Sequence, residues 1–95
     1  MKPLSVDERR TAIDALGPGW VMVEERALTK RWTFDDFAAA LAFVVRVGAV
    51  AEAQQHHPDV AFGWGRAELT LTTHDAGGIT AQDLQLAASI DAIGA

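Results

Sequence analysis

The chain of 95 residues contains no cysteine and no tyrosine, and it has only three histidines. Without cysteine it can form neither a disulfide nor a thiolate metal site, and this composition suits the reducing cytoplasm. No segment resembles a membrane span, and the first residues, MKPLSVDERR, lack the apolar run of a signal peptide. The formal net charge of −5 argues against binding nucleic acid through a basic surface. We therefore expect a cytoplasmic protein that binds neither membrane nor nucleic acid.

The hydrophobic share of 49% and the charged share of 22% are typical of a folded globular protein. At this length we expect one domain over residues 1–95. Apolar periodicity and turn residues predict a helix over 5–16, strands over 20–25 and 27–32, a helix over 34–55, strands over 60–64 and 66–73, and a helix over 81–93. Short connections favour antiparallel pairing. The predicted fold is therefore α+β, a two-layer sandwich with three helices on one face of a four-stranded antiparallel sheet, in the order α-β-β-α-β-β-α.

Hydroxyl and acidic residues three positions apart predict where the helices begin, in the manner of a capping box. These pairs are Ser5 with Glu8, Thr33 with Asp36, and Thr80 with Asp83. Pro58 disfavours helical geometry at His57, so the long helix should end just before it, with His56 in the last turn or cap.

The long helix has more apolar residues than one buried face requires. One line contains Phe34, Phe37, Leu41, Val44, Gly48 and Ala51, and a second contains Phe43, Val47 and Val50. Two interpretations stay open: the helix is sunk in the core of a monomer, or the second line is a surface on which copies of the chain associate. The second interpretation predicts that Val47→Asp leaves an independently folded monomer.

All three histidines lie within QQHHPDVAFGWGRAELTLTTHD, residues 54–75. Adjacent side chains on a helix diverge by about 100°, and no pair has the H-x-x-x-H spacing, so we expect no metal ion here. An imidazole can exchange protons near neutral pH, and the carbonyl groups at a helix C-terminus favour its protonated form. The stretch therefore indicates either proton transfer or a structural role, in which His57 bonds a loop and His56 is solvated.

The order and spacing of several residues resemble the signature of the pterin-4a-carbinolamine dehydratase family. They are Glu52, His56-His57-Pro58, Trp64, His74 and Asp83. The resemblance extends over nearly the whole chain, including Trp20 and the segments FDDFAAALAFV, THDAGGIT and DLQLAASID. Its most specific part runs from HHPD to THD, with the GG and the aspartate that follow.

The resemblance implies dehydration of a 4a-hydroxytetrahydropterin to quinonoid dihydropterin, without a metal or organic cofactor. It also implies a functional link to an aromatic amino acid hydroxylase, which produces that carbinolamine, and assembly into homodimers or homotetramers. By analogy with the family, His56 and His74 form the acid/base pair and His57 binds and orients the pterin. The division of roles between His56 and His57 stays open, because either imidazole can serve in either role.

The residues implied to support substrate binding are Glu52, Pro58, Asp59, Trp64 and Asp83, and each has a structural alternative. Glu52 lies four residues before His56, so it either holds that imidazole or is a solvated helix charge. Trp64 either borders the pterin ring or packs in the core, and Asp83 already has a complete role as a cap. Pro58 shapes the turn and Asp59 steadies it.

Two alternatives to an enzyme remain for a chain of this family. One is a binding or regulatory module, since some relatives assist the dimerisation of a transcription factor. The other is a pterin-related role in molybdenum-cofactor metabolism. The intact set of three histidines favours the dehydratase over both.

Overall fold

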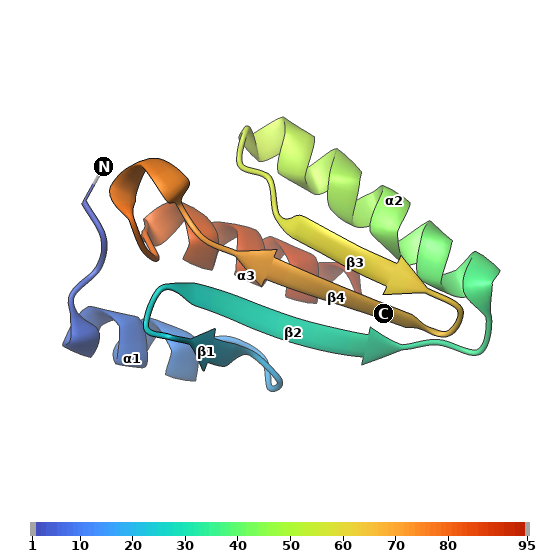
Figure 1. The fold of residues 1–95 in the computed structure, drawn as a ribbon, viewed down its shortest axis with the longest axis horizontal. Helices are drawn as coiled ribbons and strands as arrows, with labels where there is room; N and C mark the ends of the chain where they lie inside the picture. Colours follow the sequence, from blue (N-terminus) through green and yellow to red (C-terminus); the bar gives the residue numbers. More distant parts are fainter. Residues whose placement is uncertain (1, 95) are drawn as a thin grey trace.

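A computed structural model describes residues 2–94 and shows three α-helices, one short 3₁₀ helix and a four-stranded sheet (Figure 1). The elements are α1 Val6–Asp14, β1 Val21–Val23, β2 Ala27–Thr33, α2 Phe37–Gln54, β3 Asp59–Gly63, β4 Arg66–Leu71, η1 His74–Ala76 and α3 Ala81–Ile93. All neighbouring strands are antiparallel, in the order β1-β2-β4-β3. The predicted α+β class and element order are confirmed.

One face of the sheet supplies the core. Along β4, Leu69 and Leu71 are completely buried whereas Arg66 and Glu68 are exposed, which is the alternation of a strand with one solvated face. Leu69 and Leu71 belong to a hydrophobic core cluster that also includes Phe43 of α2. The helix α3 contributes Leu86, Ala87 and Ile90 to this cluster. The helices α2 and α3 therefore cover the apolar face and form the second layer of the sandwich.

Two of the three predicted capping boxes are confirmed. At α1 the Ser5 hydroxyl accepts from the Glu8 backbone, and the Glu8 carboxylate accepts from the Ser5 backbone. The Ser5 backbone N–H, with a smaller contribution from its hydroxyl, lowers the pKa of Glu8 below its usual value. At α3 the reciprocal bonds join Thr80 and Asp83.

The third predicted capping pair is wrong. Thr33 is the last residue of β2, and the Phe34 N–H still donates to the carbonyl of Gly65 at 2.8 Å, so the chain remains extended there. The helix α2 begins at Phe37, and Asp36 alone caps it by accepting from the Ala39 N–H at 2.8 Å.

The tight turn of the first hairpin lies within the range predicted for the first strand, 20–25. Its central residues are Glu24 and Glu25, both with positive φ, at 51° and 60°. The Arg26 N–H donates to the Val23 carbonyl across them at 2.9 Å. This is the geometry in which a hairpin turn matches the twist of its strands, although glycine or asparagine usually occupies it.

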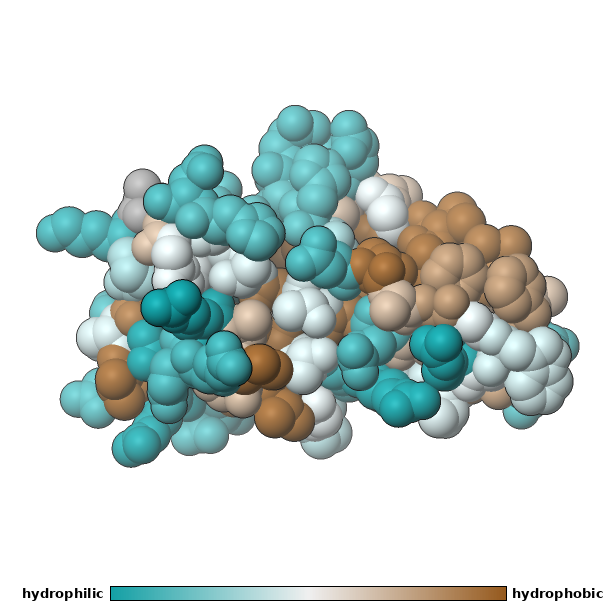
Figure 2. All heavy atoms as spheres, in the orientation of Figure 1, coloured by the Kyte–Doolittle hydropathy of each residue, from teal (hydrophilic) through white to brown (hydrophobic). Residues whose placement is uncertain are grey.

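The structure decides between the two interpretations of the second apolar line of α2. Phe43 and Val47 of the second line are completely buried, so this line is core and not a surface for association. The exposed apolar side chains are Phe37 at 45%, Leu41 at 41% and Val45 at 62%. Figure 2 shows hydrophobic side chains gathered over this end of the molecule, where α2 begins. The expectation that Val47→Asp leaves a folded monomer is therefore wrong, because the substitution would bury a charge.

The helix α2 differs from the sequence expectation in one further respect. With 18 residues and a mean hydropathy of 1.5, it meets the length and composition of a membrane span. Only 22% of it is buried within the fold, where its inner face packs against the sheet. The core helix of a soluble protein can have this length and composition, and the exposed residues of α2 are largely small or apolar.

Candidate active site

A hollow of about 480 Å³ brings together all three histidines. It is lined by Gln55, His56, His57, Thr72, Thr73, His74, Asp75 and Gln82. The lining comes from the end of α2, the end of β4 with η1, and the first turn of α3. Separate segments of the chain therefore supply imidazoles to one polar cavity.

The end of α2 directs His56 and His57 away from the helix axis. Gln55 caps the helix in the left-handed conformation, with φ 53°. Its N–H donates to the carbonyl oxygens of Ala51 and Glu52, and the His56 N–H also donates to Ala51, at 3.2 Å. The chain then turns out of the helix into β3, in agreement with the helix end predicted from Pro58.

His56 is held by a buried carboxylate. Its Nε2 lies 2.5 Å from Oδ1 of Asp83, whose side chain is completely buried. The other oxygen of Asp83 accepts from the Thr73 hydroxyl at 2.7 Å and from the Thr80 N–H at 2.9 Å. Asp83 is thus both the predicted cap of α3 and the partner of a histidine, which spacing alone did not establish.

His57 pairs with the carboxylate of Glu52, a contact that spacing did not predict. Its Nε2 lies 2.7 Å from Oε2 of Glu52, both side chains being largely exposed. Helical spacing had left two alternatives for Glu52, a bond to His56 or a solvated helix charge. The left-handed Gln55 ends the helical repeat between them, so His56 leaves the face that Glu52 occupies and His57 takes its place.

His74 enters the hollow from the opposite segment. It is the first residue of η1, separated from the end of β4 by Thr72 and Thr73, and it is solvent-exposed. Within residues 2–94 no side-chain hydrogen bond to its ring is found, in contrast to the two paired histidines. The strand ends at Leu71, earlier than the predicted range of 66–73, and a short 3₁₀ helix begins at His74.

The remaining predicted residues lie outside this lining. Pro58 is half-buried, and Asp59 is exposed as the first residue of β3, opposite Thr70. Trp64 is 72% exposed in the turn between β3 and β4, at the end of β3 remote from the histidines. In the described chain it neither borders the hollow nor packs in the core.

Sequence reasoning missed five residues of the lining: Gln55, Thr72, Thr73, Asp75 and Gln82. Four of them adjoin a predicted site residue in the sequence, which is the only signal that was available. Their side chains line the hollow because β4 ends next to the first turn of α3. Local spacing in the sequence does not predict that tertiary contact.

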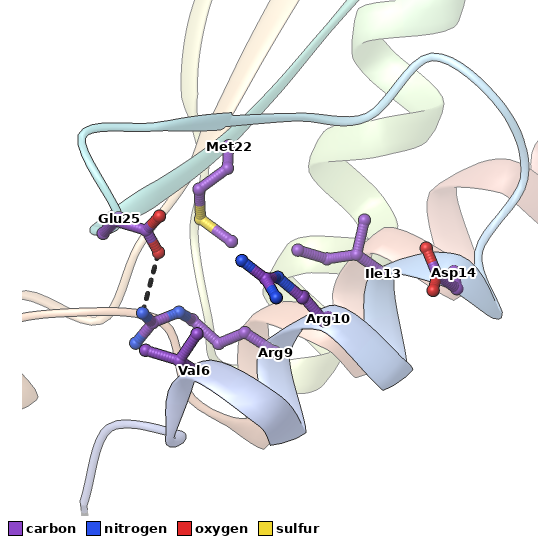
Figure 3. A pocket seen from close by; sticks show the side chains of 7 residues that line it. All are labelled: Val6, Arg9, Arg10, Ile13, Asp14, Met22 and Glu25. Carbon is purple, nitrogen blue, oxygen red and sulfur yellow. Dashed lines mark hydrogen bonds and ion pairs between the residues drawn. The ribbon is translucent and has the colours of Figure 1, made fainter.

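A second, smaller hollow of about 210 Å³ lies between α1 and the first hairpin (Figure 3). It is lined by Val6, Arg9, Arg10, Ile13, Asp14, Met22 and Glu25. Arg9 and Glu25 form an ion pair of 2.8 Å beside it. It contains none of the predicted site residues and no group that exchanges protons readily near neutral pH, so the histidine hollow is the candidate active site.

Comparison with known proteins agrees with the sequence resemblance. The family model described as pterin 4 alpha carbinolamine dehydratase matches residues 2–93. A protein of Rhizorhabdus wittichii, provisionally named pterin-4-alpha-carbinolamine dehydratase, is 44% identical over 98% of this chain and 96% of its own length. A similarly named protein of Rubrobacter xylanophilus is 51% identical over 78% of this chain and 69% of its own length.

Two solved structures share the fold. A transcriptional coactivator/pterin dehydratase from Brucella melitensis is 34% identical, with a TM-score of 0.91 over 99% of this chain and 100% of its own. A pterin dehydratase-like protein, identified as a RuBisCO assembly factor in the alpha-carboxysome, is 26% identical, with a TM-score of 0.66 over 79% of this chain and 88% of its own. With a family model that spans nearly every residue and relatives matched along almost their entire length, the chain belongs to the pterin 4 alpha carbinolamine dehydratase family.

Proposed function

We propose that the protein is a cytoplasmic hydro-lyase that dehydrates 4a-hydroxytetrahydropterin to quinonoid dihydropterin at the histidine hollow. The observation that carries the proposal is the convergence of His56, His57 and His74 on one cavity of about 480 Å³. Small-molecule sites are commonly about 300–1,000 Å³, so the hollow is large enough for a bicyclic pterin. Membership of the family supplies the substrate class.

The reaction requires one proton to be delivered and one to be removed. The bond between C4a and the hydroxyl oxygen breaks, the oxygen takes up a proton and leaves as water, and N5 loses its proton as the C4a–N5 double bond forms. No electrons are exchanged with a cofactor. Two positioned imidazoles are sufficient, and each such acid or base contributes roughly 10²–10⁴ in rate.

The surroundings of the histidines favour different roles for them. His56 rests against the buried carboxylate of Asp83, an arrangement that orients an imidazole. His74, exposed at the other side of the hollow, is the proposed second member of the acid/base pair. His57, held by the exposed Glu52, is the proposed contact that orients the pterin.

Substitution of single histidines tests this proposal. We expect His74→Ala and His57→Ala each to slow breakdown of the carbinolamine at least tenfold, because each removes a proton carrier or an orienting contact. The measurement is stopped-flow absorbance of freshly generated 4a-hydroxytetrahydropterin, with far-ultraviolet circular dichroism to verify the fold. Trp64→Ala is the matched control, since this exposed side chain lies far from the hollow and its loss should leave turnover unchanged. Wild-type turnover in both histidine variants would rule out the proposed site.

We also propose that the protein associates with itself through the exposed apolar face of α2. Phe37, Leu41 and Val45 are each more than 40% exposed in the single chain. Burying such a surface against a second copy is favourable at roughly 25 cal/mol per Å² of apolar area. This exposed face takes the place of the line containing Phe43 and Val47, which is buried, as the candidate surface for association. The proposal applies equally to a dimer or a tetramer.

The alternative of a non-catalytic binding module has one specific observation in its favour. One structural relative is described as a transcriptional coactivator/pterin dehydratase and the other as a RuBisCO assembly factor, so the roles named among these relatives are not limited to dehydration. The exposed face of α2 is the surface available for such a partner. A pterin-binding titration followed by a stopped-flow dehydration assay separates the alternatives, because a module of this kind, or one serving molybdenum-cofactor metabolism, would not turn over the carbinolamine.

A further inference from the structure

Thr73 links the two segments that carry the histidines. It is 8% exposed and lies between the last residue of β4 and the first residue of η1. Its carbonyl oxygen accepts from the N–H groups of Ala76 and Gly77, both at 3.0 Å, and its own N–H donates to Gly78 at 3.1 Å. The backbone of Thr73 therefore closes the turn that begins with His74.

The side chain of Thr73 contacts Asp83, the carboxylate that holds His56. Its hydroxyl donates to Oδ2 of Asp83 at 2.7 Å and lies 2.8 Å from the Thr80 hydroxyl. A threonine hydroxyl has one proton, and an ionised carboxylate can only accept. The Thr73 hydroxyl therefore donates to Asp83 and accepts from the Thr80 hydroxyl. The hydrogen bonds run in one direction, from Thr80 through Thr73 to Asp83.

The donors and acceptors around Asp83 also indicate which ring nitrogen of His56 carries the proton. All three partners of Asp83, the Thr73 hydroxyl, the Thr80 N–H and the His56 ring, are capable of donating. His56 then carries its proton on Nε2 and leaves Nδ1 as the nitrogen that exchanges protons. The donors on Oδ2 prevent rotation of the carboxylate, so that Oδ1 stays directed at the ring.

We propose that Thr73 is a positioning residue for the dehydration: acting through Asp83, it fixes the tautomer and orientation of His56, while its backbone holds His74 across the hollow. This inference rests on the proposed function for its effect on turnover, but not for its effect on the histidine. A hydroxyl that only stabilised the end of β4 would leave the His56 tautomer unchanged.

The test compares Thr73→Val, which removes the hydroxyl at nearly constant volume, with Thr73→Ser, which keeps it. Two-dimensional NMR of ¹⁵N-labelled imidazoles reports the tautomer of each histidine directly. At a pH where His56 is neutral, we expect the wild type and Thr73→Ser to carry the proton on Nε2, and Thr73→Val to show a mixture of tautomers. In turnover we expect a roughly tenfold lower kcat for Thr73→Val with KM within twofold, and recovery in Thr73→Ser.

Two results would overturn the inference. One is a neutral His56 in the wild type with its proton on Nδ1, a measurement that does not depend on any variant folding. The other is a Thr73→Val variant with the wild-type tautomer and wild-type kcat. If the wild type has no dehydratase activity but Thr73→Val still alters the tautomer, the proposed function fails and the positioning role stands.

Discussion

Asp83 shows how one side chain serves the fold and the candidate site together. One of its oxygens completes the cap of α3 and the other contacts His56, and the side chain has no exposed surface. An isolated buried charge is costly, so its three donors are what make its burial possible. The carboxylate is therefore tied to the histidine by stability as well as by chemistry.

Asp83→Asn is expected to lower both stability and turnover. The amide keeps the size of the side chain but turns one acceptor into a donor that faces groups which themselves donate. We expect a loss of about 1–3 kcal/mol in the free energy of unfolding and at least a tenfold loss in dehydration rate. Urea unfolding and stopped-flow turnover measure the two effects.

Asp75→Asn is the control for that substitution. Asp75 also lines the hollow but is exposed, so its change should alter the free energy of unfolding by less than about 0.5 kcal/mol. If Asp83→Asn were as stable and as active as the wild type, the buried pair would have neither role.

At the level of residues, the sequence predicted the members of the site better than their contacts. His56, His57, His74 and Asp83 were identified by spacing and resemblance, and the structure brings them together. Spacing left open whether Glu52 holds His56 or is solvated; its partner is His57, because the left-handed Gln55 interrupts a helical repeat that spacing takes to be continuous. No local pattern in the sequence indicates that conformation at a glutamine.

At the level of elements, α2 shows that apolar periodicity does not predict which face of a helix packs against the sheet. Apolar spacing showed that more than one side of this helix is hydrophobic, but not which side meets the sheet. That choice depends on how β3 and β4 pack beneath the helix, with Phe43 in contact with Trp32 and Phe34. Element order and caps depend on local residues, and these were largely predicted.

A pair of substitutions on α2 checks the corrected assignment of its faces. Val47 is completely buried, and Val45, two residues earlier, is 62% exposed. We expect Val47→Asp to cost more than about 3 kcal/mol in the free energy of unfolding, because it buries an unpaired charge. Val45→Asp should change the unfolding free energy of the isolated chain by only about 0.5 kcal/mol. Equal effects in urea unfolding would show that the two faces are assigned wrongly.

At the level of the whole molecule, the exposed face of α2 predicts association. We expect the wild type to have the mass of a homo-oligomer by light scattering, and Val45→Asp to shift it towards the monomer, because a carboxylate opposes burial of that face. Val21→Asp is a matched control, since Val21 is 57% exposed on the far edge strand β1. A wild type that is monomeric at high concentration, or a Val45→Asp protein of unchanged mass, would contradict the proposed surface.

The central claim is that the histidine hollow of this protein performs the dehydration, and it is tested most directly by following the decay of freshly generated 4a-hydroxytetrahydropterin in a stopped-flow spectrometer. The prediction is that the wild type accelerates this decay well beyond buffer and that His74→Ala, while folded, loses at least nine-tenths of the acceleration. Decay at the rate of buffer with folded wild-type protein, or full acceleration by His74→Ala, would contradict it.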